Sequence, residues 1–183
     1  MKKYIFPLLT ILSLIAIQCK KSSTDAGDQL PPITTTGANT FGCLVNGNVW
    51  LPYGVSYSVP TLNVNVVIPT GNSGKSEIQI FANKAEQNEN SGIYITIRGI
   101  SDTGTYQIEN YLNTGLVYFN GNTSYEPFDT FGIVHISRCD TIQKIISGTF
   151  SFIGYTNTNH SIGETVSITE GRFDVHWPLL KTD

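Results

Sequence analysis

The stretch Ile93-Tyr-Ile-Thr-Ile-Arg98 decides the fold class, because its isoleucines occupy every second position. A period of two places these three side chains on one face of a β-strand and the other three on the opposite face. Residues 62–68 and 77–80 alternate in the same way. Strands that bury one face and expose the other are typical of antiparallel sheets.

The chain from Phe41 onward extends this pattern over a whole domain. It shows no helical stripe of useful length, and turn sequences such as Asn46-Gly47 separate its alternating segments. About nine short strands in one domain predict an antiparallel β-sandwich, and a flattened or partly open β-barrel is the alternative. We therefore expect a single all-β domain over residues 41–183.

Two segments near the C-terminal end echo each other, Gly148-Thr-Phe-Ser-Phe152 and Gly171-Arg-Phe-Asp-Val175. We interpret them as neighbouring strands of one sheet. The apolar residues change parity between Ile168 and Phe173, so one extra residue is needed to keep both on the same face. Because glycine readily adopts the positive φ of a bulge, we predict a β-bulge at Glu170-Gly171.

The N-terminal residues have the pattern of an exported bacterial lipoprotein. A basic start, Met1-Lys-Lys3, precedes an uncharged run over residues 4–17, which is shorter than the roughly 20 residues of a spanning helix. Cys19 follows, at the position where such proteins carry a diacylglycerol on sulfur, although Gln18 replaces the usual small residue before it. We predict a signal peptide over residues 1–18 and a lipidated Cys19. The alternative is an ordinary secretory signal with an incidental cysteine.

Residues 19–40 are predicted to be the lipidated cysteine and a flexible tether. Pro31-Pro32 forbids a helix, and few apolar side chains are available to offset the entropy of ordering. Charged residues make up only 14% of the chain, and the formal net charge is −3. Because no run of Lys or Arg occurs in the domain, we expect no nucleic-acid partner.

Three short segments carry a resemblance to known proteins: Thr40-Phe-Gly-Cys-Leu-Val-Asn-Gly47, Ile145-Ile-Ser-Gly-Thr-Phe-Ser-Phe152 and Ile168-Thr-Glu-Gly-Arg-Phe-Asp-Val175. They resemble a family of predicted lipoproteins of the Bacteroidota, which has no assigned activity. The resemblance implies an all-β fold and an outer membrane anchor in the cell envelope, but no functional residue. In that group, acidic residues just after the cysteine accompany surface display. Residues 20–24 contain none, which favours a periplasm-facing anchor over surface display.

The histidines and carboxylates do not form a recognisable catalytic or metal-binding motif. We interpret His135 as an interior or rim residue and His160 as a loop residue. His176 shares a strand face with Arg172 and Asp174. This polar face either lines a ligand groove or faces the solvent and contains an intrastrand ion pair. We expect no metal and no cofactor. A non-enzymatic binding or structural domain is the leading interpretation, and a glycan-acting or other hydrolase is an alternative.

The least regular segment, residues 106–131, interleaves aromatic and asparagine side chains. Flat aromatic faces beside amide groups are how sugar-binding sandwiches hold glycans, although aromatic residues also fill the cores of β-proteins. A carbohydrate-binding module is therefore an alternative, and the partner is a glycan or an envelope protein. The candidate ligand-binding residues are Tyr106, Tyr111, Tyr118, Tyr125 and Phe128.

Two thiols remain once Cys19 is lipidated, those of Cys43 and Cys139. An even number of cysteines in an oxidising compartment favours a disulfide, which requires Cα atoms about 4.4–6.8 Å apart. The alternative is that Cys43 is a small buried apolar residue and Cys139 a free thiol at the end of a strand.

Overall fold

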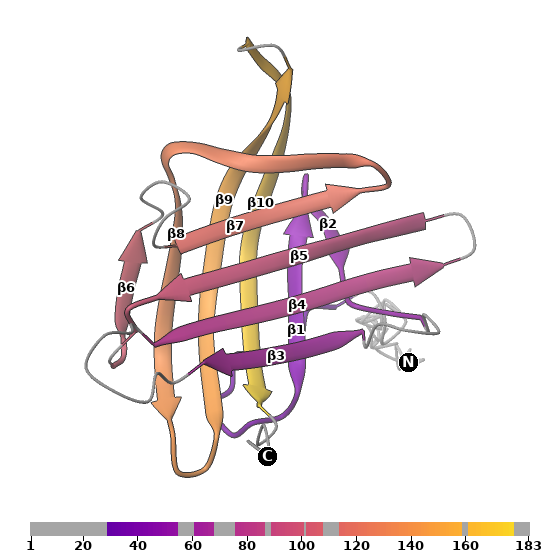
Figure 1. Ribbon diagram of the computed structural model, residues 1–183. Helices are drawn as coiled ribbons and strands as arrows, with labels where there is room; N and C mark the ends of the chain where they lie inside the picture. Colours follow the sequence, from indigo (N-terminus) through magenta and orange to yellow (C-terminus); the bar gives the residue numbers. More distant parts are fainter. Residues whose placement is uncertain are drawn as a thin grey trace, which may run out of the picture.

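The computed structural model describes residues 29–54, 61–67, 76–86, 89–100, 102–107, 114–158 and 161–177. This part of the chain forms ten strands and no helix, and so contains no helix that crosses a membrane (Figure 1). The strands are β1 (Thr40–Val45), β2 (Asn48–Trp50), β3 (Leu62–Val67), β4 (Glu77–Glu86), β5 (Glu89–Arg98), β6 (Gly104–Gln107), β7 (Thr114–Asn120), β8 (Thr123–Asp140), β9 (Ile145–Thr158) and β10 (Ser161–His176).

The strands follow one hydrogen-bonded path in the order β2-β1-β10-β9-β8-β7-β5-β4-β3, and β6 pairs with β8. Every pair of these strands is antiparallel. The long strand β8 belongs to both halves of the path. Its first residues pair with β7, whereas residues 132–140 pair with β9 after a register shift that begins at Pro127.

The two halves of the sheet face each other as layers. Figure 1 shows β3, β4, β5 and β7 running across β1, β8, β9 and β10 at a steep angle. This is orthogonal packing, in which a corner strand passes from one layer to the other at a bulge or bend. The sheet therefore has the two layers of the predicted sandwich and the continuous strand order of a partly open barrel, and the all-β antiparallel prediction is confirmed.

The core lies between the layers and consists mainly of branched aliphatic side chains. The alternating stretch of residues 93–98 is part of β5, and its isoleucines at 93, 95 and 97 are at most 1% exposed. Ile80 and Leu116 extend this apolar surface on the neighbouring strands. The facing layer contributes Val134, Ile136, Ile146, Phe150, Ile168, Phe173 and Val175.

The C-terminal hairpin confirms two predictions. The echoing segments lie side by side in β9 and β10, and the register shifts between Ile168 and Gly171 as the bulge requires. The positive φ of this bulge belongs to Glu170 (φ 50°) and not to Gly171. Gly171 is required for a different reason, which is the close approach of an aromatic ring from β9.

Residues 30–39, called the N-terminal strap below, lie against the outer face of the sheet. The sequence assigned them to the flexible tether, and the structure corrects that boundary. Asp174 of β10 accepts hydrogen bonds from Thr34 and from the backbone of residues 36–38. The Arg172 guanidinium donates to the carbonyl of Pro31 at 3.3 Å. The strap is therefore part of the domain, held by polar contacts that composition alone does not indicate.

Candidate functional site

A polar cleft with a volume of about 390 Å³ opens where the β1–β2 turn meets the facing layer. It is lined by strands from both layers, so the curling of the sheet creates it. Three asparagines, two tyrosines and one lysine give it its polar character. The lining residues are Val45, Asn46, Asn48, Val49, Trp50, Lys84, Tyr118, Asn120, Tyr125, Thr165 and Val166.

Aromatic rings form the inner part of the polar cleft. Trp50 and Tyr118 are 5% and 6% exposed, and Trp50 donates its indole N–H to Ser91 Oγ at 2.9 Å. Tyr118 pairs across the β7–β8 hairpin with Tyr125, and their ring centroids lie 5.8 Å apart at an interplanar angle of 34°. Tyr125 is half-buried. The three aromatic residues of the lining are therefore buried to different extents, and Tyr125 is the most exposed of them.

The surroundings of Tyr125 favour the protonated form of its phenol. Its hydroxyl donates to Glu164 Oε2 at 3.2 Å. Partial burial raises the pKa of Tyr125, and the hydrogen bond to the Glu164 carboxylate and its charge raise it further. Because the phenol is neutral at physiological pH, it can contribute an apolar ring face and a hydrogen-bonding oxygen to the cleft.

The asparagines at the rim differ in whether their side-chain amides form hydrogen bonds within the domain. Asn46 has φ 49°, accepts from the Ser167 N–H at 2.8 Å and so fixes the turn to β10. Asn48 Nδ2 donates to the Asn46 carbonyl at 3.4 Å. Asn120 is exposed at the end of β7, and its amide has no hydrogen-bond partner within the described residues. Its donor and acceptor groups remain available for a ligand.

Two of the predicted ligand-binding residues, Tyr118 and Tyr125, are brought together here. Tyr106 does not line the cleft, because it lies on β6, packs against the core and donates its hydroxyl to the Asp102 carbonyl at 2.8 Å. Tyr111 and the side chain of Phe128 lie outside the described residues.

Several lining residues are absent from the sequence-based candidates. The dipeptide Asn46-Gly47 indicated only a turn, and nothing local marked Trp50 or Lys84 as neighbours of the tyrosines. Trp50 lies on β2 and Lys84 on β4, which are near opposite ends of the strand order. Both residues nevertheless line the cleft together with the tyrosines. The β7–β8 hairpin was the available local signal, since it places Tyr118 and Tyr125 opposite each other.

The N-terminal strap covers Asp174 on the polar face of β10, whereas His176 on the same face is exposed and Arg172 lines a hollow beside the strap. Asp174 is 1% exposed under the N-terminal strap and accepts from Thr34 Oγ1 at 2.6 Å and Ser147 Oγ at 2.7 Å. Backbone N–H groups of residues 36, 37 and 38 donate to it at 2.9, 2.8 and 3.1 Å. Arg172 pairs with Glu170 at 3.1 Å, so the intrastrand ion pair does not involve Asp174.

The hydrogen bonds explain the charge state of Asp174. Burial by itself would raise the pKa of this carboxyl, but donors from Thr34, Ser147 and the strap backbone outweigh burial. The pKa of Asp174 is therefore held well below its usual range. This carboxylate joins the strap to β9 and β10, which is a structural role.

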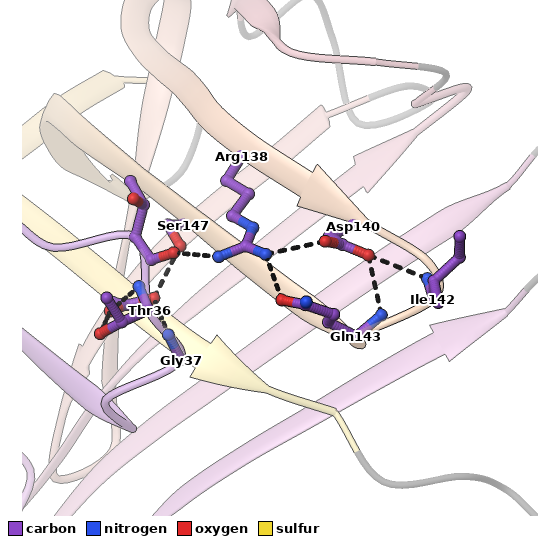
Figure 2. A network of polar contacts seen from close by, with 9 residues as sticks. Thr36, Gly37, Arg138, Asp140, Ile142, Gln143 and Ser147 are labelled. Atoms are coloured by element: carbon purple, nitrogen blue, oxygen red, sulfur yellow. Dashed lines mark hydrogen bonds and ion pairs between the residues drawn. The ribbon is translucent and has the colours of Figure 1, made fainter.

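Arg138 extends these contacts to the neighbouring turn (Figure 2). Its guanidinium donates to the Thr35 carbonyl, to Gln143 and to Asp140 Oδ2, the last at 2.8 Å. Asp140 Oδ1 in turn accepts from the backbone N–H groups of Ile142 and Gln143 in the β8–β9 turn, at 3.0 and 2.8 Å. The network thus ties the strap to the end of the β8–β9 hairpin.

A second hollow, with a volume of about 310 Å³, lies on the outer face of β8, β9 and β10 beside Ile33 of the strap. Ile133 and His135 contribute to it from β8. His135 is exposed, because Val134 and Ile136 take the inward positions of that strand, and its Nδ1 lies 3.0 Å from Thr105 Oγ1.

The disulfide considered from the sequence is not formed, and both Cys43 and Cys139 are free thiols. Strands β10 and β9 lie between β1 and β8, so the two cysteines are separated by three inter-strand steps of about 4.8 Å. That separation exceeds what a disulfide can bridge. Burial raises the pKa of the Cys43 thiol to about 12.

No group of three His, Cys, Asp or Glu side chains suited to a metal ion occurs among the described residues. Comparison of the chain with protein families, with characterised proteins and with solved structures finds no match. The features that bear on function are therefore the polar cleft and the N-terminal sequence.

Proposed function

We propose that this chain is a lipid-anchored protein of the cell envelope whose β domain is a non-enzymatic binding module. The observation that carries the binding role is the polar cleft. It combines three amides with aromatic rings in a concave space, and its volume falls in the range of about 300–1,000 Å³ typical of small-molecule sites.

The lining favours recognition over catalysis. Its described residues are amides, phenols, an indole, a hydroxyl, a lysine and aliphatic side chains, with no carboxylate, imidazole or thiol among them. Glycoside hydrolysis by the common mechanisms requires two carboxyl groups across the scissile bond. Glu164 is bonded to a lining residue, but its carboxylate already accepts the Tyr125 hydroxyl.

The anchor is supported by the sequence from Met1 to Cys19. A Cys19→Ser substitution should abolish lipidation and release the protein from the membrane fraction, because the diacylglycerol is attached to that sulfur through a thioether. Several chains are required, since one short chain binds only marginally. A wild-type protein that fractionates as soluble and carries no lipid by mass spectrometry contradicts the anchor.

The binding role is tested with the full chain in detergent and washed envelope polysaccharide from the producing cell as the probe. We expect retention of the wild type and reduced retention of Asn120→Ala, which removes an exposed amide with no structural partner. Asn63→Ala on the edge strand β3 is the matched control, because it also removes one amide but does not line the cleft. Equal retention of both variants excludes the polar cleft as the site.

A further inference from the structure

We infer that the polar cleft takes a neutral oligosaccharide, with Tyr125 contacting a sugar ring and Asn120 bonding its hydroxyl groups. This inference depends on the proposed binding role and names its ligand class. It is carried by three properties of the cleft: its hydrogen-bonding groups, its charge and the position of its accessible ring.

The hydrogen-bonding groups suit hydroxyl groups of a ligand. An asparagine amide offers two N–H donors and one carbonyl acceptor, so one side chain can bond two neighbouring hydroxyls that each donate and accept. Asn120 has this full capacity available, and the exposed Thr165 adds a hydroxyl to the same lining. Asn48 lies on the other side of the opening and is exposed as well.

The charge of the cleft suits a neutral ligand. Lys84 is the one charged side chain in the described lining. Glu164, whose carboxylate accepts the hydroxyl of the lining residue Tyr125, adds one opposite charge. The cleft therefore has neither the cluster of Arg and Lys that holds phosphate or sulfate nor the carboxylate pair that holds a cation.

The aromatic side chains suit the apolar face of a sugar ring. Tyr125 is half-buried, so part of its ring contacts solvent while Tyr118 supports it from the core side at 5.8 Å. An aromatic face fixed in this way offers apolar contact area at little entropic cost to a ring that also carries polar groups at its edge. The hydroxyls at that edge then lie within the reach of the rim amides.

The test is isothermal titration of the full chain in detergent with neutral hexasaccharides of the glucan, mannan, xylan and galactan types. A polyuronic hexasaccharide is the charged comparator. We expect at least one neutral probe to bind and the comparator to bind more weakly. Asn120→Ala should weaken binding by about tenfold. Tyr125→Phe should retain most of the affinity, because it keeps the ring, whereas Tyr125→Ala should lose it.

The controls separate this inference from the broader binding role. Asn63→Ala should bind as the wild type does, and thermal unfolding of each variant shows whether lost binding reflects lost folding. Absence of binding by every neutral probe overturns the inference that the ligand is a neutral oligosaccharide, as does binding that Asn120→Ala leaves unchanged. If the envelope polysaccharide is still retained through Asn120 in that case, the binding role survives. If it is not retained, both fail.

Discussion

Phe150 lies directly opposite Gly171 in the β9–β10 pair, and its ring occupies the space that a Cβ atom at position 171 would fill. Such a Cβ would lie 2.6 Å from the nearest ring atoms of Phe150. The reciprocal pair is Gly148 with Phe173, whose ring would lie 2.8 Å from a Cβ at position 148. The repeated Gly-x-Phe pattern thus interlocks because the two strands run antiparallel, and the rings of Phe150 and Phe173 stack at 6.4 Å.

Gly171→Ala should destabilise the domain by about 1–3 kcal/mol, because the added methyl group overpacks the core against the Phe150 ring. Urea unfolding measures the change. Gly115→Ala is the matched control, since its Cβ would lie 3.9 Å from the nearest atom, the Cβ of Thr96. We expect that control to be neutral or slightly stabilising. Equal losses in the two variants would show that ring contact is not the cause.

Asp174→Ala should lower the free energy of unfolding by about 3 kcal/mol, because it leaves Ser147 and several strap N–H groups without their acceptor. The free energy is measured by urea unfolding. Glu170→Gln, which removes an exposed ion pair with Arg172, serves as the control and should cost less than about 1 kcal/mol. Similar losses for the two variants would contradict the clamping role of Asp174.

The stabilising effect of Asp174 should depend on pH in one direction. Its pKa is lower in the folded protein than the value of about 3.9 in an unfolded chain, so its stabilisation is complete above pH 4 and declines as the pH falls below that value. Urea midpoints of the wild type and Asp174→Asn should therefore converge on acidification. The pKa values of Glu77 and Asp140 are also lowered, but both residues are present in each protein and cancel in the comparison. A constant difference from pH 7 to pH 2 would contradict the expectation.

The two domain cysteines should be free and unequal in reactivity. In the Cys19→Ser chain, denaturation without reductant should allow iodoacetamide to label both. Under native conditions Cys43 should remain unlabelled, because burial raises its pKa to about 12 and the thiolate is the reacting form. Cys139 is half-buried and should react slowly, since partial burial and the charges of Asp102 and Asp140 raise its pKa. Recovery of a disulfide-linked peptide pair would contradict the structure.

Periodicity predicted the parts of the fold that depend on neighbouring residues. The alternation in residues 93–98 determined which side chains of β5 are buried, and the parity break before Phe173 located the bulge. The strap was missed because its order depends on hydrogen bonds to Asp174, a residue about 140 positions away. Pro31-Pro32 excludes a helix correctly, but it does not exclude an extended segment bound by its backbone.

The candidate site was predictable only where its residues share a hairpin. Tyr118 and Tyr125 face each other across the short β7–β8 turn, so local sequence contains that relationship. Trp50 and Lys84 enter the cleft through the closing of the two layers, which no local pattern encodes. The even number of cysteines favoured a disulfide that is not formed, because such a count takes no account of the two strands that lie between β1 and β8.

The attachment of the strap also determines how the domain responds to tension. A pull on the chain from the N-terminal side reaches the Arg172 contact with Pro31 before the bonds between Thr34 and Asp174. Only after these contacts and those of residues 35–39 break does the force reach Thr40, where β1 begins its pairing with β10. If the N-terminus is fixed to a membrane, drag on the domain is therefore borne by side-chain bonds that can re-form, and the β1–β10 ladder is protected from peeling.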